Sequence, residues 1–185
     1  ARPTPAAGAP SVVADAAAIY FCAQPPYHRW VDQFPALQNA AIDLANGSGA
    51  RLIVAENLYG YGSTTERLTE ETPLRPTTRK GRVRADMHRL PLGSRDDGTL
   101  KTAIARGSDF FGPYVEGSAA GARAIKAILA GKPVEYTGNL EALHSYTFIK
   151  DFGSAMATLG TDDRALGQVW HVPNAEAVSS RRFFE

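Results

Sequence analysis

The sequence predicts an α/β fold with a mainly parallel sheet flanked by helices. Short apolar runs that are typical of buried strands alternate with segments whose apolar residues recur at helical spacing. Glycine and proline punctuate the links between these segments. The composition agrees with this fold, because 44% of the 185 residues are hydrophobic and 21% are charged. That is enough apolar material for a buried core in one domain, with or without a small lobe.

The first elements read as a strand, a helix and a strand. Residues 17–23 are a continuous apolar run closed by prolines, which predicts a strand buried on both faces, with Cys22 as a small buried hydrophobe. Apolar residues at helical spacing predict a helix over residues 31–46, and two glycines stop it. Residues 51–55 predict a second short buried strand. This order, with tight links, is typical of a parallel βαβ unit.

The later elements continue the alternation. We expect, in order, a helix from Thr77 or Thr78 to Leu90, a polar loop at 94–98, a strand at 101–105, a helix at 118–130, strands at 134–137 and 146–149, a helix at 151–159, a strand at 168–172 and a capped helix starting at 179. Ligands of parallel sheets bind outside the carboxyl ends of the strands. Three segments fall there, at residues 22–30, 57–62 and 107–113. The pattern therefore predicts a pocket for a small molecule.

Composition also excludes several classes of protein. Lys and Arg number 20 against 19 for Asp and Glu, so the net charge of +1 gives no electrostatic footprint for nucleic acid or an anionic membrane. No apolar run approaches the roughly 20 residues of a membrane helix. Cys22 is the only cysteine, and the four histidines lack metal-ligand spacing, so we expect neither an internal disulfide nor a metal site. The expectation is a reduced, cytoplasmic, soluble protein.

The two ends of the chain indicate a segment of something longer. The chain begins at Ala1 without a methionine or a signal peptide, and it stops within the first turn of the helix expected from residue 179. Ragged natural termini are the alternative interpretation.

Several segments in order resemble the NAD-dependent epimerase/dehydratase family of the extended short-chain dehydrogenase/reductases. They are residues 19–23 (the family's fourth strand), 57–62 (the end of its fifth strand and a Tyr-Gly), 70–73 (an acidic-Thr-Pro stretch), 106–113 (the turn after its sixth strand), 146–152 and 168–172. The resemblance implies a Rossmann-like core over residues 1–113. It also implies a partial substrate-binding lobe over residues 114–185, with interleaved core elements.

The family's glycine-rich phosphate loop has no counterpart in the sequence. We therefore expect the first strands of the sheet to lie upstream of Ala1, and the cofactor, NAD or NADP, to depend on them. The resemblance implies an oxidoreductase that acts on a hydroxyl or carbonyl group of a small, sugar-like substrate. The residues that it implies are Asn57, Lys80 and Tyr61 for catalysis, Cys22, Ala23, Lys80, Gly107 and Ser108 for the cofactor, and His28 and Phe110 for the substrate.

The catalytic pattern departs from the family. A Ser or Thr is expected where Asn57 stands, and a Tyr four residues before Lys80, where the chain has Pro76, or Thr77 if one residue is inserted. Neither residue can act as a phenolic acid. The alternative function is therefore a catalytically degenerate NAD(P)-binding or scaffold protein. In that interpretation Lys80 belongs to a solvated basic face, Asn57 is a turn residue and Tyr61 packs in the core. Pairing through the edge of strand 17–23 predicts a homodimer.

Overall fold

The structure is a computed structural model, and it describes residues 13–93 and 100–185. The expected loop at 94–98 lies outside the described residues. The elements are β1 (Ala18–Phe21), η1 (Tyr27–Arg29), α2 (Trp30–Ser48), β2 (Arg51–Glu56), η2 (Tyr59–Tyr61), α3 (Arg79–Gly93), β3 (Thr102–Arg106), β4 (Asp109–Phe111), α4 (Ala122–Leu129), β5 (Leu143–His144), β6 (Tyr146–Phe148), α5 (Ile149–Thr161), η3 (Asp163–Ala165), β7 (Val169–His171), β8 (Val178–Ser179) and α6 (Ser180–Phe184).

The chain divides into two compact units. The first unit holds residues 1–106 and 156–171, and the second holds residues 107–155 and 172–185. Each unit is described by itself below. The domain boundary expected after residue 113 stays a prediction.

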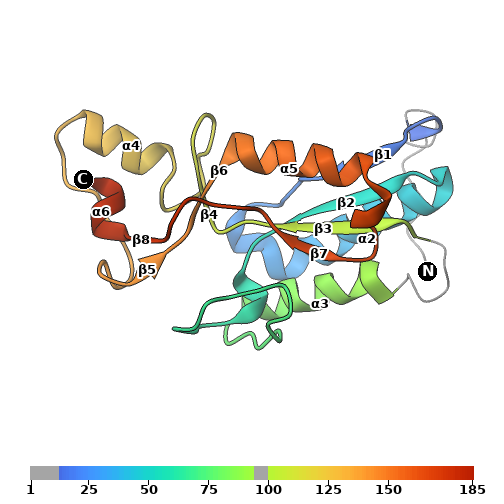
Figure 1. Cartoon of the computed structure of the whole chain (residues 1–185), viewed down its shortest axis with the longest axis horizontal. Helices are drawn as coiled ribbons and strands as arrows, with labels where there is room; N and C mark the ends of the chain where they lie inside the picture. Colours follow the sequence, from blue (N-terminus) through green and yellow to red (C-terminus); the bar gives the residue numbers. More distant parts are fainter. Residues whose placement is uncertain (1–12, 94–99) are drawn as a thin grey trace. The chain divides into compact units, whose positions relative to one another are not determined.

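The first unit is built on a four-stranded sheet in the order β1-β2-β3-β7 (Figure 1). All three neighbouring pairs are parallel, with Phe21 opposite Val54, Glu56 opposite Arg106, and Arg106 opposite His171. The prediction of a mainly parallel sheet with flanking helices is confirmed. Because parallel strands point the same way, their carboxyl ends share one edge of the sheet.

The helices of this unit begin and end where the sequence provides caps. The α2 helix ends at Gly49, whose φ of 70° is left-handed, and the Gly49 N–H donates to the Ala45 carbonyl at 2.9 Å. The α3 helix begins after Thr78, whose Oγ1 accepts a hydrogen bond from the Gly81 N–H at 3.0 Å. Both helices thus agree with the sequence-based expectation.

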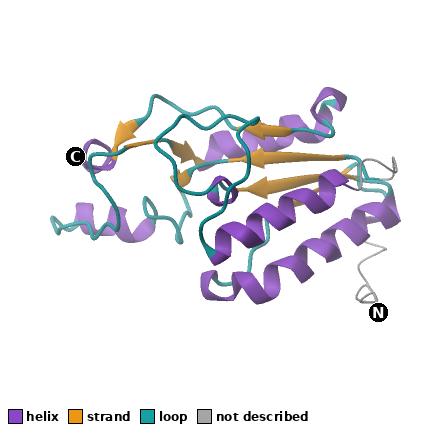
Figure 2. Cartoon of the chain, turned by 90° about the horizontal axis from the view of Figure 1, so that it is seen from below, coloured by secondary structure: helices purple, strands orange, loops and turns teal. Residues whose placement is uncertain are grey.

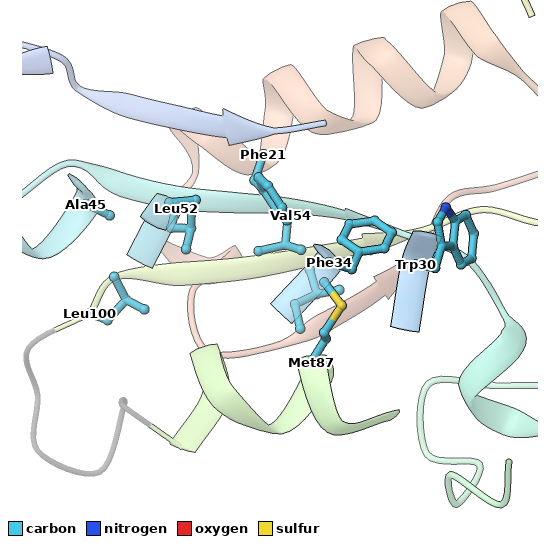
Figure 3. Close-up of a cluster of buried hydrophobic side chains, with 10 residues drawn as sticks. Phe21, Trp30, Phe34, Ala45, Leu52, Val54, Met87 and Leu100 are labelled. Atoms are coloured by element: carbon cyan, nitrogen blue, oxygen red, sulfur yellow. The ribbon is translucent and has the colours of Figure 1, made fainter. Parts of the chain in front are cut away.

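A hydrophobic core lies between the sheet and these two helices. Figure 2 shows α2 and α3 side by side against one face of the sheet. Phe34 of α2, Leu52 of β2 and Met87 of α3 are almost fully buried in one cluster (Figure 3). Gln38 joins the helices, because its Nε2 donates to the Met87 carbonyl at 2.6 Å. Close packing in this core sets the positions of the two helices against the sheet, and so the positions of the helix starts relative to the strand ends.

The expectation for the first strand is wrong in part. The strand β1 is shorter than residues 17–23, Tyr20 is 44% exposed, and Cys22 is an exposed residue beyond the strand end. The reason is that β1 is the edge of the sheet within the part of the chain that the structure describes. An edge strand has no neighbour to cover its outer side, so its apolar side chains are not enclosed.

The second unit contains two small sheets. The strands β4 and β6 pair in parallel, and β5 and β8 pair antiparallel. The rings of Tyr146 and Phe183 stack at 3.7 Å between centroids, and the Tyr146 hydroxyl donates to Ser180 Oγ at 2.8 Å. The strand expected at 134–137 is wrong, because this segment forms no ladder. It is anchored instead by Tyr136, whose hydroxyl accepts from Ser180 Oγ at 2.9 Å.

Candidate functional site

The carboxyl ends of β1 and β2 gather three aromatic rings and one ammonium group. Lys80, in the first turn of α3, has its Nζ 3.4 Å from the ring centroid of Tyr27. The Tyr27 hydroxyl lies 3.4 Å from the Tyr59 hydroxyl. The Trp30 ring contacts both, with centroids 4.9 Å from Tyr27 and 5.8 Å from Tyr59. We name Tyr27, Trp30, Tyr59 and Lys80 the Lys80 cluster.

The two tyrosines of the Lys80 cluster face solvent. Tyr27 is 53% exposed and Tyr59 is 40% exposed, whereas Trp30 is buried and its indole N–H donates to the Pro25 carbonyl at 3.1 Å. A cation over a ring face is attracted by the ring quadrupole, by about 0.5–1 kcal/mol at an exposed site. The cluster therefore presents at the surface two phenolic oxygens and the Lys80 ammonium, which lies over the Tyr27 ring.

Gly81 is what allows α3 to approach this edge. A Cβ atom at Gly81 would lie 2.7 Å from the Tyr59 carbonyl oxygen and 3.1 Å from the Cβ of Pro76. Real Cβ atoms do not come so close to backbone, so only glycine fits. The close approach brings the first turn of α3, which carries Lys80, against the backbone of η2. No local pattern in the sequence predicts the contact between Gly81 and the Tyr59 carbonyl oxygen.

Asn57 holds the turn after β2. Its side-chain oxygen Oδ1 accepts a hydrogen bond from the Tyr59 N–H at 3.1 Å, in the geometry of an Asx turn. This contact positions Tyr59 within the Lys80 cluster. A direct role of the Asn57 amide toward a substrate stays a prediction.

Tyr61 lies under the surface, in contact with the end of β7. It is only 4% exposed, and its hydroxyl is 2.6 Å from Nε2 of His171. Burial raises the pKa of Tyr61, and the nearby Arg106 only partly opposes this. Burial also lowers the pKa of His171. At neutral pH the phenol is therefore the donor and the neutral imidazole the acceptor.

Glu70 completes this contact from the loop after η2. Its Oε1 accepts a hydrogen bond from the His171 backbone N–H at 2.7 Å. Partial burial raises the pKa of Glu70, but the hydrogen bonds from the His171 and Glu70 N–H groups outweigh it, so the net pKa is lowered. Glu70 stays ionised and holds the strand end.

A buried ionic cluster lies behind the two strand ends. Arg106 Nε donates to Glu56 Oε2 at 3.1 Å, and these two side chains are 2% and 3% exposed. Arg106 Nη2 also donates to His88 Nδ1 at 2.8 Å, since a guanidinium can only donate. Burial, followed by the charges of Arg106 and Arg89, lowers the pKa of His88 to about 4. The imidazole is therefore neutral and serves as an acceptor.

Arg84 adds a second buried cation to this cluster. Its guanidinium lies 5.0 Å from the Trp30 ring and 4.4 Å from the Phe34 ring. Its Nε and Nη1 are buried and have no hydrogen-bond partner among the described residues. Burial lowers the pKa of Arg84, while burial raises the pKa of Glu56 against the effect of both arginines. Two guanidinium groups thus face a single carboxylate.

Three other expected residues follow β1 at the surface. Cys22 and Ala23 are exposed, and His28 is exposed in η1. Neighbouring atoms still desolvate the Cys22 sulfur enough to raise the pKa of its thiol. A raised pKa disfavours the nucleophilic thiolate.

The remaining expected residues belong to the second unit. The Ser108 N–H donates to Thr147 Oγ1 at 2.9 Å, and its Oγ is 3.4 Å from His144 Nε2. The same His144 nitrogen is 2.9 Å from Asp109 Oδ2. Because both partners share one nitrogen, this is not the arrangement of a catalytic triad, which uses both nitrogens. Phe110 packs edge-on against Phe152, at 4.9 Å between ring centroids.

Gly107 is required by the same packing. A Cβ atom at Gly107 would lie 2.7 Å from the ring of Phe110.

The described residues include no group of three histidine, cysteine, aspartate or glutamate side chains that could hold a metal ion. None of the helices in the described ranges is long and apolar enough to cross a membrane.

A family model described as the NAD dependent epimerase/dehydratase family matches residues 36–172 of this chain. The chain belongs to this family. A comparison with curated proteins finds no match.

Solved structures with the same fold include sugar-nucleotide enzymes. One is a double mutant of the dTDP-glucose 4,6-dehydratase DesIV from Streptomyces venezuelae with NAD and DAU bound, at TM-score 0.81 and 16% identity over 95% of this chain and 57% of that chain. A second is the dTDP-glucose 4,6-dehydratase from Bacillus anthracis in complex with NAD, at 0.81 and 20% over 94% and 57%. A third is the UDP-glucuronic acid 4-epimerase from Bacillus cereus in complex with NAD, at 0.78 and 19% over 93% and 58%.

At these identities the likeness shows the fold, which is Rossmann-like as expected. This chain spans 57–58% of the length of those three structures.

Proposed function

We propose that the chain supplies the catalytic side of an NAD(P)-dependent oxidoreductase of the epimerase/dehydratase type. Its substrate would be a small, sugar-like molecule that carries a hydroxyl or carbonyl group. The observation that carries the proposal is the Lys80 cluster, which places an ammonium and two phenols at the carboxyl edge of a parallel sheet. Membership of the family supports the reaction class. A cytoplasmic location is part of the proposal, because Cys22 has no cysteine partner within this sequence.

The residues present fit one half of a nicotinamide dinucleotide. The segment after β1 carries no glycine before η1, and Gly60 and Gly62 after β2 lead into a loop rather than a helix. A pyrophosphate cradle of the strand–turn–helix kind is therefore not among the described residues. The nicotinamide riboside half does fit, because its hydroxyl and amide groups need donors and acceptors such as those of Lys80 and Asn57.

Lys80 would hold the ribose hydroxyls and place positive charge beside the substrate oxygen. Such a charge stabilises negative charge that develops on that oxygen when its proton leaves. When bound, the dinucleotide supplies a hydride acceptor or donor. Cys22, Ala23, Gly107 and Ser108 remain proposed cofactor contacts.

His28 and Phe110 remain proposed substrate contacts. His28 is exposed in η1, directly after Tyr27 of the Lys80 cluster. A donor at that point could contact a substrate hydroxyl.

A second function, a degenerate NAD(P)-binding protein, is favoured by one observation. Pro76 stands where the family has its phenol, and Tyr61 is buried with its hydroxyl bound to His171. A buried phenol with a raised pKa is a poor proton acceptor near neutral pH.

The test uses the full-length natural protein. Chromatography follows the conversion of a panel of nucleotide sugars in the presence of NAD, because a reaction of the epimerase or dehydratase type returns the hydride and leaves no net NADH. Calorimetry follows binding of NAD and NADP. Lys80→Ala should lower turnover by at least about tenfold, a threshold set below the roughly 10²–10⁴-fold effect of one catalytic group. Lys101→Ala, an exposed lysine just before β3, is the matched control and should keep the parent rate. Binding without turnover would support the second function. The absence of both binding and turnover would refute both functions.

A further inference from the structure

The phenols nearest Lys80 are not the one that the sequence nominated. Tyr61 is buried and donates to His171, so its oxygen is withdrawn from the surface. Tyr27 and Tyr59 are exposed, their hydroxyls are 3.4 Å apart, and the Lys80 ammonium lies over the Tyr27 ring. At this edge of the sheet, the buried Tyr61 therefore has a structural role, whereas Tyr27 and Tyr59 are accessible to a substrate.

We propose that Tyr27 is the proton-transferring residue of this site, with Tyr59 as its relay to solvent and Lys80 as the cation that stabilises its oxygen. The inference rests on the proposed function and names the residue that carries its proton chemistry. It also assigns the aromatic segment after β1 a catalytic role, although this segment is distant in sequence from Lys80.

The proton path balances without a permanently charged phenol. When a substrate alcohol is oxidised to a carbonyl, its C–H bond breaks and the two electrons leave as a hydride to the oxidised nicotinamide dinucleotide named in the proposed function. The O–H bond of the alcohol breaks at the same time, and its proton moves to the Tyr27 oxygen. The proton of Tyr27 passes to the Tyr59 oxygen, and the Tyr59 proton passes to water. The reverse sequence protonates a carbonyl oxygen during reduction.

The geometry favours Tyr27 as the contact residue. A general acid or base must be within hydrogen-bond reach of the substrate, which requires an exposed hydroxyl. Tyr27 is the more exposed of the two tyrosines, and its ring is held from one side by Lys80 and from another by Trp30. Asn57 fixes the backbone of Tyr59 through the Asx turn, and the Tyr59 hydroxyl lies 3.4 Å from that of Tyr27, where it can accept the proton next.

The first experiment separates the hydroxyl from the ring. Tyr27→Phe keeps the ring over which the Lys80 ammonium lies and removes only the oxygen. In the full-length protein, with NAD and the nucleotide sugar that gives turnover as probes, kcat should fall by about a hundredfold while KM for NAD stays within about twofold. Tyr59→Phe should lower kcat less, because water can replace a relay. Tyr114→Phe, a fully exposed tyrosine of the second unit, is the matched control and should keep the parent kcat.

The second experiment needs no turnover and uses the full-length protein. Acetic anhydride acetylates exposed amines, and mass spectrometry gives the acetylation rate of Lys80. Tyr27→Leu removes the ring and should raise that rate severalfold, whereas Tyr27→Phe should leave it unchanged. Equal rates in Tyr27→Leu and the parent would show that the ring does not hold the ammonium, and the proposal would fail.

The outcomes separate this inference from the proposed function. A parent protein that neither binds NAD nor converts any of the nucleotide sugars overturns the proposed function, and with it the role of Tyr27. A parent that turns over, together with Tyr27→Phe at the parent kcat, overturns the role of Tyr27 alone and leaves the proposed function standing.

Discussion

Replacing Arg106 with leucine should be the most damaging single change in the buried ionic cluster. Arg106 contacts three groups at once: it donates to Glu56 at 3.1 Å, donates to His88 at 2.8 Å, and lies 4.7 Å from the centroid of the Tyr61 ring. Leucine fills part of the volume but supplies no donor. Glu56 then stays 4% exposed without its hydrogen-bonded partner.

The magnitude follows from burial. Removing one partner of a buried ion pair typically costs about 3–5 kcal/mol, because the other charge is left in a poorly solvating environment. Arg84 still lies near Glu56 and offsets part of this cost. We therefore expect a loss of about 3 kcal/mol in the free energy of unfolding at pH 8, a large share of the 5–15 kcal/mol that stabilises an ordinary domain.

The loss should shrink at pH 5, and both titrating neighbours give the same sign. Burial raises the pKa of Glu56 above 4.5 in the folded protein. The folded state therefore binds the extra proton, and stability falls as pH rises through that raised pKa. Without Arg106 this pKa rises further, which adds loss at high pH. His88 has a folded pKa of about 4 against 6.5, so stability falls as pH drops between these values. Removing Arg106 relieves this effect at pH 5.

Urea unfolding followed by the fluorescence of Trp30, which is buried in the same unit, measures the change. Arg89→Ala is the control, since its pair with Asp86 is exposed and worth about 0.2–1 kcal/mol. The double variant Glu56→Gln, Arg106→Met should recover only part of the loss, because the uncompensated Glu56 carboxylate is gone but the buried Arg84 guanidinium has then lost its acidic neighbour. A loss for Arg106→Leu no larger than that of Arg89→Ala, or one that is equal at pH 5 and pH 8, would refute the reasoning.

Three further predictions concern the site and the sheet edge. Gly81→Ala should cost about 1–3 kcal/mol in the same unfolding assay, because its Cβ would lie 2.7 Å from the Tyr59 carbonyl oxygen; unchanged stability would contradict the close approach of α3. The 185-residue chain should bind NAD and NADP weakly in a calorimetric titration, since the described residues hold no pyrophosphate cradle, and micromolar binding would contradict this. The unpaired side of β1 should make the chain dimerise or aggregate in light scattering, whereas a clean monomer would mean that the edge is covered.

The elements that the sequence predicted best are those whose burial repeats over many residues. The segment 51–55 is apolar after its first residue, Arg51, and it lies in β2 with Leu52, Ile53 and Val54 all buried. The strands β4, β5 and β8 have two or three residues each and were missed, because so few residues cannot show an alternation. The segment 134–137 contains residue types that are common in strands, but it joins no sheet. The Tyr136 side chain instead contacts Ser180 through a hydrogen bond and Phe184 through its ring.

The site shows where local pattern stops being informative. The start of the helix that carries Lys80 could be predicted from periodicity and a threonine cap, whereas a role of Lys80 in the site follows only from the resemblance to the family. The contact of Lys80 with Tyr27 could not be predicted, since the Tyr27 ring reaches the ammonium only through the fold. The Tyr27 and Tyr59 hydroxyls are 32 residues apart, and the Tyr61 and His171 side chains are 110 apart. A parallel crossover brings such residues to one edge without any constraint on their spacing in sequence.

What decides between neighbours at that edge is a difference in burial that no local signal carries. Tyr59 and Tyr61 are separated by one glycine, yet one is 40% exposed and the other 4%. The short helix η2 turns one side chain outward to the Lys80 cluster and the other inward to His171. An exposed phenol can exchange a proton with a substrate, and a buried one with a raised pKa serves packing. The single turn η2 therefore separates the two phenols, and the sequence pattern predicts the position of this turn but not which side chain it directs outward.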